Sequence, residues 1–463
     1  MICKCVYNKH VGRNKFAQFR HRYRSVPELR KLVPAYTAPL PKDQNLAEND
    51  NFAVPADESA PHQIAGETPM LHNAGETPTL PEAGGTPTLQ AGMTPEQLAE
   101  AKQYGRYSLA CTLADKGLDL LFLTFAAVVV ARPLDAWLQG VSLLERFASL
   151  RLVVFFLLVT LLHICVSLPL SFYSGYILEH RFHLSTLSVG GWAQRYLKQN
   201  LLGIVLGALL IVGLYWLIWT TQGWWWLAAA GAFFCVTIIM GRLFPVLIMP
   251  LFYKIEPLDA PELAEQMNEL AAGTGLTIEG VYRIALSAET VKANAMLAGL
   301  GRTRRVLLGD TLLNNFSPTE IAVVFAHEIG HHVFRHVRKM ILLGLVLSVA
   351  GFWICDRSLT WWAGQPLDYA HLPIWLQPWI MLILLVFGML LEPLMNGISR
   401  HHERQCDRYA FERIRQPDAY ISAFSKLAQQ NKDDPCPHWF EVLWLHDHPP
   451  IGERLAIAET NST

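Results

Sequence analysis

His327-Glu328-Ile329-Gly330-His331 is the most informative stretch of this sequence. An α-helix turns about once every 3.6 residues, so His327 and His331 share one face and can present two imidazoles to one ion. Glu328, beside the first histidine, can then reach an attacking water as a general base. The motif predicts a zinc site with hydrolytic chemistry, provided that it lies on a helix.

The residues before the motif predict that helix. Ser317-Pro318-Thr319-Glu320 has the pattern of a capping box, with proline at the first helical position. Apolar residues then recur at helical spacing up to the motif, at Ile321, Val324, Phe325 and Ile329. The two histidines are therefore expected in the second half of one helix.

A site with two histidines needs a third protein ligand, which leaves a fourth position for water. The best candidate is Glu403, within Ser399-Arg400-His401-His402-Glu403-Arg404-Gln405-Cys406-Asp407. Asp407 lies four residues further, on the same helical face, where it can hold a ligand histidine through the free ring N–H. Taken alone, Glu403 would be read as a solvated carboxylate, but the upstream motif favours a ligand.

Charge and cysteine content exclude several classes of protein. The net charge is −1 over 463 residues, so nothing indicates a nucleic-acid partner. The eight cysteines are scattered and form no Cys-x-x-Cys pair, which argues against a disulfide framework and against a cysteine zinc site.

Apolar runs indicate a multi-pass integral membrane protein that lies in a lipid bilayer. Several approach or exceed the roughly 20 residues that cross a bilayer. The expected number of transmembrane helices is about six, with runs near 117–137, 152–173, 201–220, 224–247, 341–356 and 374–395. The fifth run is short, and we expect it to continue the metal-binding helix. Lys and Arg are concentrated in alternate loops, which predicts a cytoplasm-facing zinc site.

Composition divides the chain into three parts. Residues 1–92 are expected to be a disordered basic tail followed by a Pro/Gly/Thr linker, in which Ala-Gly-x-Thr-Pro recurs every eight or nine residues. Residues 93–250 are expected to form an N-terminal membrane domain with four spans, and 251–463 a zinc peptidase domain with two more. A helix start directly after Met93 suggests the hypothesis that translation begins there.

The segment between the fourth and fifth apolar runs predicts a small soluble fold. Pro257–Ala272 has the pattern of an amphipathic helix. Three strand-like runs follow at Val281–Leu286, Asn294–Leu297 and Arg305–Leu308. Strands before a metal helix suit a peptidase, because a sheet edge can hold an extended substrate by backbone pairing.

From about residue 95 to 460 the chain resembles the type 1 CAAX prenyl proteases and their bacterial heat-shock protease relatives (HtpX-like), which are membrane zinc metallopeptidases. The Glu179 and Pro250 elements point to the prenyl protease branch. The motifs that carry the resemblance are Glu179-His180-Arg181-Phe182, Pro250-Leu251-Phe252-Tyr253, Asn294-Ala295, Gly309-Asp310-Thr311-Leu312-Leu313, the histidine motif with His336, Glu403 with Asp407, and His448-Pro449-Pro450 with Arg454.

This resemblance implies a mainly α-helical membrane protein that carries a zincin-type α+β metalloprotease domain. It implies one Zn²⁺ per chain, bound by His327, His331 and Glu403, with Glu328 as the base. His448 would stabilise the oxyanion with Arg454 nearby, and Asn294 and Ala295 would lie on the strand that pairs with substrate. The substrate would be a peptide or protein, with prenylated C-terminal tails as the candidate class.

Two residues of the site region depart from the family pattern, and three alternative functions remain open. Cys406 replaces a small alanine before Asp407, and His332 adds an imidazole beside the second ligand. A quality-control protease of the HtpX type would share every site residue. An intramembrane protease of the site-2 kind would need its motif inside an apolar run, whereas charged residues flank this one. A non-catalytic zinc-binding sensor would not need Glu328.

Overall fold

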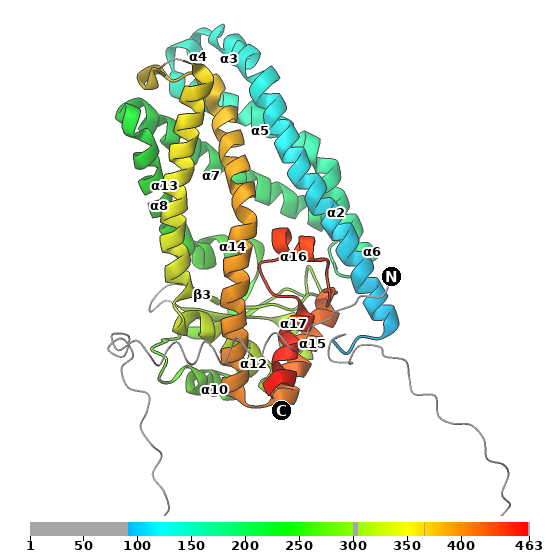
Figure 1. Ribbon diagram of the computed structural model, residues 1–463. Helices are drawn as coiled ribbons and strands as arrows, with labels where there is room; N and C mark the ends of the chain where they lie inside the picture. Colours follow the sequence, from blue (N-terminus) through cyan, green and yellow to red (C-terminus); the bar gives the residue numbers. More distant parts are fainter. Residues whose placement is uncertain (1–90, 300–303, 365, 462–463) are drawn as a thin grey trace, which may run out of the picture. The chain divides into compact units, whose positions relative to one another are not determined.

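The computed structural model describes residues 91–299, 304–364 and 366–461, all of which belong to one compact unit, Gly84–Thr463 (Figure 1). The tail and linker expected at 1–92 lie outside the described residues, apart from Ala91 and Gly92. The three-part division of the chain and the start at Met93 therefore stay predictions.

Five continuous helical stretches among the described residues are long and apolar enough to cross a membrane: Pro95–Gln139, Ala148–Arg181, Val189–Phe252, His336–Ala363 and Ile374–Ile414. The third contains two helices, because the positive φ of 47° at Gln222 separates α7 from α8. The six apolar runs of the sequence thus fall on six helical segments, as expected. These are α2 (Pro95–Phe125) with α3 (Ala131–Gln139), α5 (Ala148–Phe172), α7 (Val189–Thr221), α8 (Trp225–Leu243), α13 (His336–Ala363) and α14 (Gln377–Ile414).

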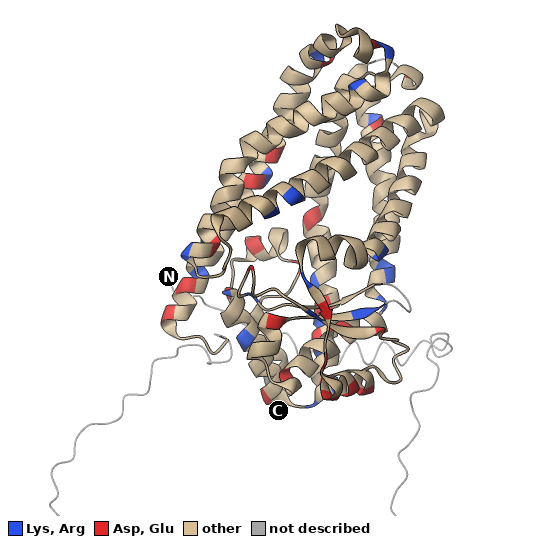
Figure 2. Ribbon diagram, turned by 180° about the vertical axis from the view of Figure 1, so that it is seen from behind, with Lys and Arg blue, Asp and Glu red and all other residues tan. Residues whose placement is uncertain are grey.

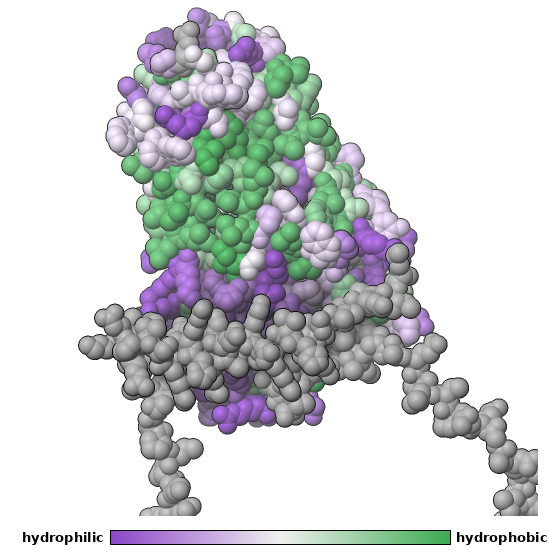
Figure 3. Space-filling model, viewed as in Figure 1, coloured by the Kyte–Doolittle hydropathy of each residue, from purple (hydrophilic) through white to green (hydrophobic). Residues whose placement is uncertain are grey.

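The surface of these helices is apolar over most of their length, as Figure 3 shows in green. Leu209, Leu342 and Leu390 are 67%, 63% and 68% exposed. Soluble monomers rarely expose contiguous apolar patches of this kind, so a bilayer is the solvent that fits them. The chain is an integral membrane protein.

Many of the charged residues lie near the helix ends and around the sheet (Figure 2). Several of those within the spans make paired contacts. Lys116 of α2 pairs with Glu392 of α14, and His163 of α5 lies 2.9 Å from Asp119 of α2. Pairing of this kind is expected where ionisable groups lie at membrane depth. His163 therefore has a partner on a neighbouring helix.

A four-stranded sheet lies next to the lower ends of the long helices in Figure 1. Its order is β1-β2-β4-β3, with β2 and β4 parallel and both other pairs antiparallel. The strands are β1 (Ile255–Pro257), β2 (Gly280–Ile284), β3 (Ala295–Ala298) and β4 (Arg305–Gly309). Three of them match the predicted runs, and β3 is an edge strand.

Shorter helices make up the rest of the fold, and most of them belong to the peptidase part. The predicted amphipathic helix begins at Pro261 rather than Pro257, because β1 occupies the preceding residues. Met267 of this helix packs with Val306 of the sheet and Phe325 of the metal helix in one buried cluster. The remaining helices are α4 (Ser142–Arg146), α6 (Glu179–Arg181), α9 (Met249–Phe252), α10 (Pro261–Ala271), α11 (Asp310–Asn315), α12 (Pro318–Val333), α15 (Pro417–Asn431), α16 (Trp439–Leu445) and α17 (Ile451–Asn461).

The metal helix α12 begins with the predicted capping box. The Ser317 hydroxyl accepts from the Glu320 backbone N–H, and the Glu320 carboxylate accepts from the Ser317 N–H. Its end differs from the expectation that the membrane helix continues it. Arg335 has a left-handed backbone (φ 58°), so α12 stops at Val333 and α13 starts separately at His336. The motif lies outside all five of these stretches, which argues against the site-2 alternative.

Candidate metal centre

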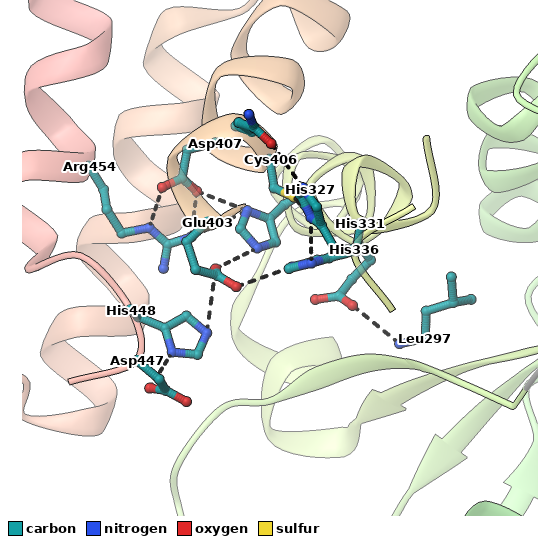
Figure 4. Close-up of polar contacts among 12 residues, drawn as sticks. Leu297, His327, His331, His336, Glu403, Cys406, Asp407, Asp447, His448 and Arg454 are labelled. Carbon is teal, nitrogen blue, oxygen red and sulfur yellow. Dashed lines mark hydrogen bonds and ion pairs between the residues drawn. The ribbon is translucent and has the colours of Figure 1, made fainter. Parts of the chain in front are cut away.

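His327 and His331 of α12 both direct their Nε2 atoms at Glu403 of α14 (Figure 4). His327 Nε2 lies 3.0 Å from Glu403 Oε2, and His331 Nε2 lies 3.2 Å from Oε1. The helices approach closely here, since a Cβ added at Gly330 would lie 3.0 Å from the Cα of Cys406. A glycine between the two histidines thus lets the third candidate ligand reach them.

These three side chains fit a zinc ion. Ligand atoms in a tetrahedral site with bonds of about 2.0 Å lie roughly 3.3 Å apart, close to the separations seen here. Glu403 is only 4% exposed, and its Oε2 has no donor in hydrogen-bonding geometry among the described residues despite the nearby imidazole. An ionised carboxylate buried without a donor is costly unless a cation lies beside it.

The surroundings of His327 favour positive charge. Burial lowers the pKa of this imidazole, but the neighbouring carboxylates of Asp407 and Glu403 outweigh burial and raise the pKa to about 9. A divalent cation supplies the positive charge that these two carboxylates favour.

Asp407 contacts the ring nitrogen of His327 that points away from Glu403. The Nδ1 atom of His327 lies 2.8 Å from Asp407 Oδ1, which leaves Nε2 free to face Glu403. Arg454 of α17 donates to both oxygens of Asp407, at 3.0 and 2.6 Å. Arg454 therefore contacts Asp407, rather than Glu328 or the metal-facing nitrogens, so its geometry is that of a positioning residue.

His331 is held by a different kind of partner. Its Nδ1 lies 3.2 Å from Nδ1 of His336, whose Nε2 lies 2.9 Å from Gln405 Oε1. If His336 donates its Nε2–H to Gln405, its Nδ1 accepts from His331, and Nε2 of His331 is left free for metal. The sequence identified His336 only as part of a family motif and did not identify Gln405. The one available signal was the spacing of His336 after the motif.

Cys406 offers an alternative third ligand. His327, His331 and Cys406 have ligand atoms within 4.8 Å of one another. The Cys406 Sγ is nevertheless packed against α12, 3.1 Å from where a Gly330 Cβ would lie, and 3.6 Å from His336 Nδ1. Both Nε2 atoms face Glu403 instead, so we interpret Glu403 as the third ligand and Cys406 as a packing residue.

Glu328 lies beside the first ligand and contacts the edge strand. Its Oε2 accepts a hydrogen bond of 3.3 Å from the backbone N–H of Leu297 in β3. The carbonyl of Asn294 instead accepts from the Gly309 N–H, at the β4 side. Because strand residues alternate, Ala295 and Leu297 present their backbone groups at the free edge, next to Glu328.

Most of the candidate residues line one cleft of about 490 Å³, which α2, β3, α12 and the segment after α16 enclose. Asn294, Ala295, Glu328, His448 and Arg454 all line it. His448 points its Nε2 at Glu403 Oε2, 3.5 Å away, and its Nδ1 lies 2.8 Å from Asp447. The hydrogen bond to Asp447 raises the pKa of His448, with burial opposing and Glu403 adding to the effect.

Comparisons with known proteins agree with this architecture. Residues 257–461 match the family model "Peptidase family M48", and residues 76–254 match "CAAX prenyl protease N-terminal, five membrane helices". The uncharacterized metalloprotease YhfN of Bacillus subtilis is 29% identical over 384 residues, which is 79% of this chain and 86% of that protein. CAAX prenyl protease 1 of Saccharomyces cerevisiae is 29% identical over 353 residues, 69% of this chain and 76% of that one.

A solved structure shares the fold. The crystal structure of S. mikatae Ste24p superposes with a TM-score of 0.70 at 24% identity, over 81% of this chain and 92% of that chain. The two family models together cover nearly the whole described part of the chain. This chain belongs to peptidase family M48 and is an integral membrane metallopeptidase of the CAAX prenyl protease type.

Proposed function

We propose that this metallopeptidase uses one zinc ion, bound by His327, His331 and Glu403, to cleave the C-terminal tail of prenylated proteins. The observation that carries the metal site is the approach of both Nε2 atoms to a buried carboxylate at 3.0 and 3.2 Å. The prenylated substrate class is supported by the N-terminal family model and by relatives named CAAX prenyl protease 1.

Glu328 is the general base in this proposal. Zinc held by the three ligands would acidify a water molecule and polarise the scissile carbonyl. Glu328 accepts a proton as the water oxygen attacks the carbonyl carbon, and later gives a proton to the leaving amine. Its contact with Leu297 orients the carboxylate toward the edge where the peptide lies.

The remaining side chains bind the substrate, stabilise the oxyanion or orient a ligand. An extended substrate pairs with the free edge of β3 through Ala295 and Leu297, while Asn294 lines the adjoining cleft wall. His448 faces Glu403, and Asp447 favours its protonated form, so it can donate to the oxygen that becomes negative. Arg454 acts through Asp407, which in turn orients His327.

The distribution of Lys and Arg supports a cytoplasmic orientation of this site. Arg335, Arg338 and Lys339 all lie at the start of α13, on the peptidase side of that span. Basic residues close to a span end favour the cytoplasmic side of a membrane. A reporter fused after residue 463 and protease protection of sealed vesicles would measure the orientation.

The function is tested by zinc content and by cleavage of a farnesylated peptide in the wild type, Glu328→Gln and Glu403→Ala. We expect Glu328→Gln to keep zinc and to lose about 10²–10⁴-fold in rate. Glu403→Ala should lose both zinc and activity. The matched control is Glu412→Gln, an exposed carboxylate on the same helix as Glu403.

Three outcomes would overturn the proposal. Full turnover by Glu328→Gln would contradict the role of Glu328 as the base. Zinc retention by Glu403→Ala would contradict the ligand set. Preference of the wild type for an unfolded membrane protein over the farnesylated peptide would indicate a quality-control protease instead.

A further inference from the structure

A second cavity reaches the metal ligands from within the membrane part. It has a volume of about 400 Å³, inside the usual range of about 300–1,000 Å³ for small-molecule sites. Helices α8, α13 and α14 enclose it, and we call it the α8–α13 cavity. Its wall is mainly apolar and includes Phe233, Phe234, Val337, Met340 and Ile341.

Several polar side chains in this wall already have partners. The Thr237 hydroxyl donates to the Phe233 carbonyl at 2.9 Å, and the Ser348 hydroxyl donates to the Gly344 carbonyl at 2.6 Å. Both nitrogens of His336 are engaged by His331 and Gln405. The wall therefore offers water few free donors or acceptors, and an apolar occupant displaces none of these bonds.

The α8–α13 cavity and the polar cleft approach the metal centre from different sides. His331 and Glu403 line the cavity, whereas His327 and Glu328 line the cleft. The lining sets of the two have no residue in common. A substrate that joins a peptide to a hydrocarbon chain close to the scissile bond would occupy both spaces at once.

We infer that the α8–α13 cavity holds the isoprenoid chain of the substrate while its peptide lies along β3. The inference rests on the proposed function, which supplies a substrate with such a chain. It adds a location for that chain, in contact with Met340 and Phe233 and directly beside His331. Chain burial there would position the prenylated cysteine next to the metal centre and disfavour unmodified peptides.

Gly344 provides the cleanest probe of the cavity. It lines the wall on α13, and a Cβ built there meets no atom within 4 Å. Gly344→Phe should therefore extend a ring into the cavity without a backbone clash. Gly231→Phe is the matched control, because Gly231 is an exposed glycine of α8 with equally open space at its Cβ and does not line the cavity.

The experiment compares one peptide carrying cysteine S-farnesyl, S-geranyl or S-methyl groups, with the full-length purified protein. We expect Gly344→Phe to raise KM for the farnesyl peptide by about tenfold or more, since buried hydrocarbon is the main source of its affinity. The geranyl peptide should be affected less, and the S-methyl peptide hardly at all. Zinc content should be unchanged, and the Gly231→Phe control should match the wild type.

A binding measurement accompanies the kinetics and does not need turnover. Glu328→Gln protein is irradiated with a peptide that carries a photoreactive isoprenoid analogue, and the cross-linked residue is mapped by mass spectrometry. We expect labels on Met340 or Phe233, reduced by Gly344→Phe. Labels confined to α2 or to the outer face of α5 would overturn the inference.

The outcomes separate this inference from the proposed function. If the wild type prefers the farnesyl peptide but Gly344→Phe slows farnesyl and S-methyl peptides equally, the cavity is not the chain site and the proposed function stands. If Met340 is labelled but the wild type cleaves no prenylated peptide, the cavity binds the chain and the proposed function is wrong. If Met340 and Phe233 are not labelled and no prenylated peptide is cleaved, both the inference and the proposed function are wrong.

Discussion

The two histidines of α12 lie one turn apart, yet their surroundings are opposite in character. The side chain of His327 is 8% exposed and bonds to a carboxylate whose charge is balanced by Arg454. The side chain of His331 is 27% exposed and is held by His336, which bonds in turn to the neutral amide of Gln405. One ligand is fixed by buried ions and the other by a neutral hydrogen-bond chain.

The difference follows from what lies behind each ring. A buried carboxylate is tolerated only with a countercharge, and α17 supplies one behind His327. Behind His331 lies the apolar α8–α13 cavity, where another ion would be costly. A neutral imidazole orients the ligand there without adding charge. The two proposed ligands of one ion are thus positioned by unlike chemistry, so their supports should respond differently to mutation.

The largest effect is expected at Asp407. Asp407→Ala leaves the Arg454 guanidinium buried without its partner and frees His327 to rotate. We expect a loss of about 3–5 kcal/mol in unfolding free energy, together with loss of zinc. The melting temperature in detergent and the zinc content measure the two effects.

The double variant Asp407→Ala/Arg454→Met separates charge from orientation. It should recover part of the stability, because no unpaired ion remains, but none of the zinc. A single Asp407→Ala variant that retains both its melting temperature and its zinc would contradict the ionic account of the His327 side.

A smaller and more selective effect is expected at His336. His336→Ala removes the partner of His331 Nδ1 but leaves no buried charge. Zinc affinity should fall by about 10–100-fold, as for other residues that orient a ligand, while the melting temperature changes little. Competition with a chelator measures the affinity, and the exposed His371→Ala serves as the control. Equal affinities of the two variants would show that His336 plays no part in the site.

The sequence predicted the His327 side of the centre better than the His331 side, for a physical reason. Asp407 follows Glu403 by one helical turn, so its placement could be derived from one helix alone. His336 contacts His331 only because Arg335 adopts a left-handed conformation that ends α12 and turns the chain. Nothing in the apolar pattern marks that break, and the two helices were therefore expected to be continuous.

The fold was predictable to a similar extent. The six apolar runs, the capping box at Ser317 and three of the four strands follow from local periodicity. Strand β1 was missed, since Ile255–Pro257 has only three residues and ends in proline. The α8–α13 cavity could not be predicted from the sequence either, because it depends on how helices that are distant in the sequence pack together.

A substitution at the start of α12 should affect both histidines alike, because both lie on that helix. Burial alone would raise the pKa of Glu320, but Lys426, Ser422 and the Ser317 N–H outweigh burial and lower it. A carboxyl with a lowered folded-state pKa stabilises the protein above its unfolded pKa, and this stability is lost as pH falls through the folded value. Glu320→Gln should therefore cost about 1–2 kcal/mol at neutral pH and progressively less in acid.

Thermal melting of Glu320→Gln and of the wild type between neutral pH and about pH 4 checks this expectation. The exposed Glu412→Gln is again the control. A gap in melting temperature that widened toward acid would mean that the Glu320 carboxylate is not stabilised as its contacts indicate.

The smallest effect is expected at Cys406. If this thiol only packs against Gly330, Cys406→Ala should change the unfolding free energy by about 1 kcal/mol or less and leave zinc bound. Cobalt-substituted wild-type protein should then lack the near-ultraviolet band of a cobalt thiolate. That band, or zinc loss in Cys406→Ala, would make the thiol a ligand and remove the neutral character of the His331 side.

The break at Arg335 has one more consequence. His336 is the first residue of a bilayer-spanning helix, and its ring contacts the proposed ligand His331 directly. Spanning helices tilt when the hydrocarbon layer around them thins or thickens. A change in lipid chain length that tilts α13 would thus shift the ring of His331, so that catalysis could be tuned by the thickness of the surrounding membrane.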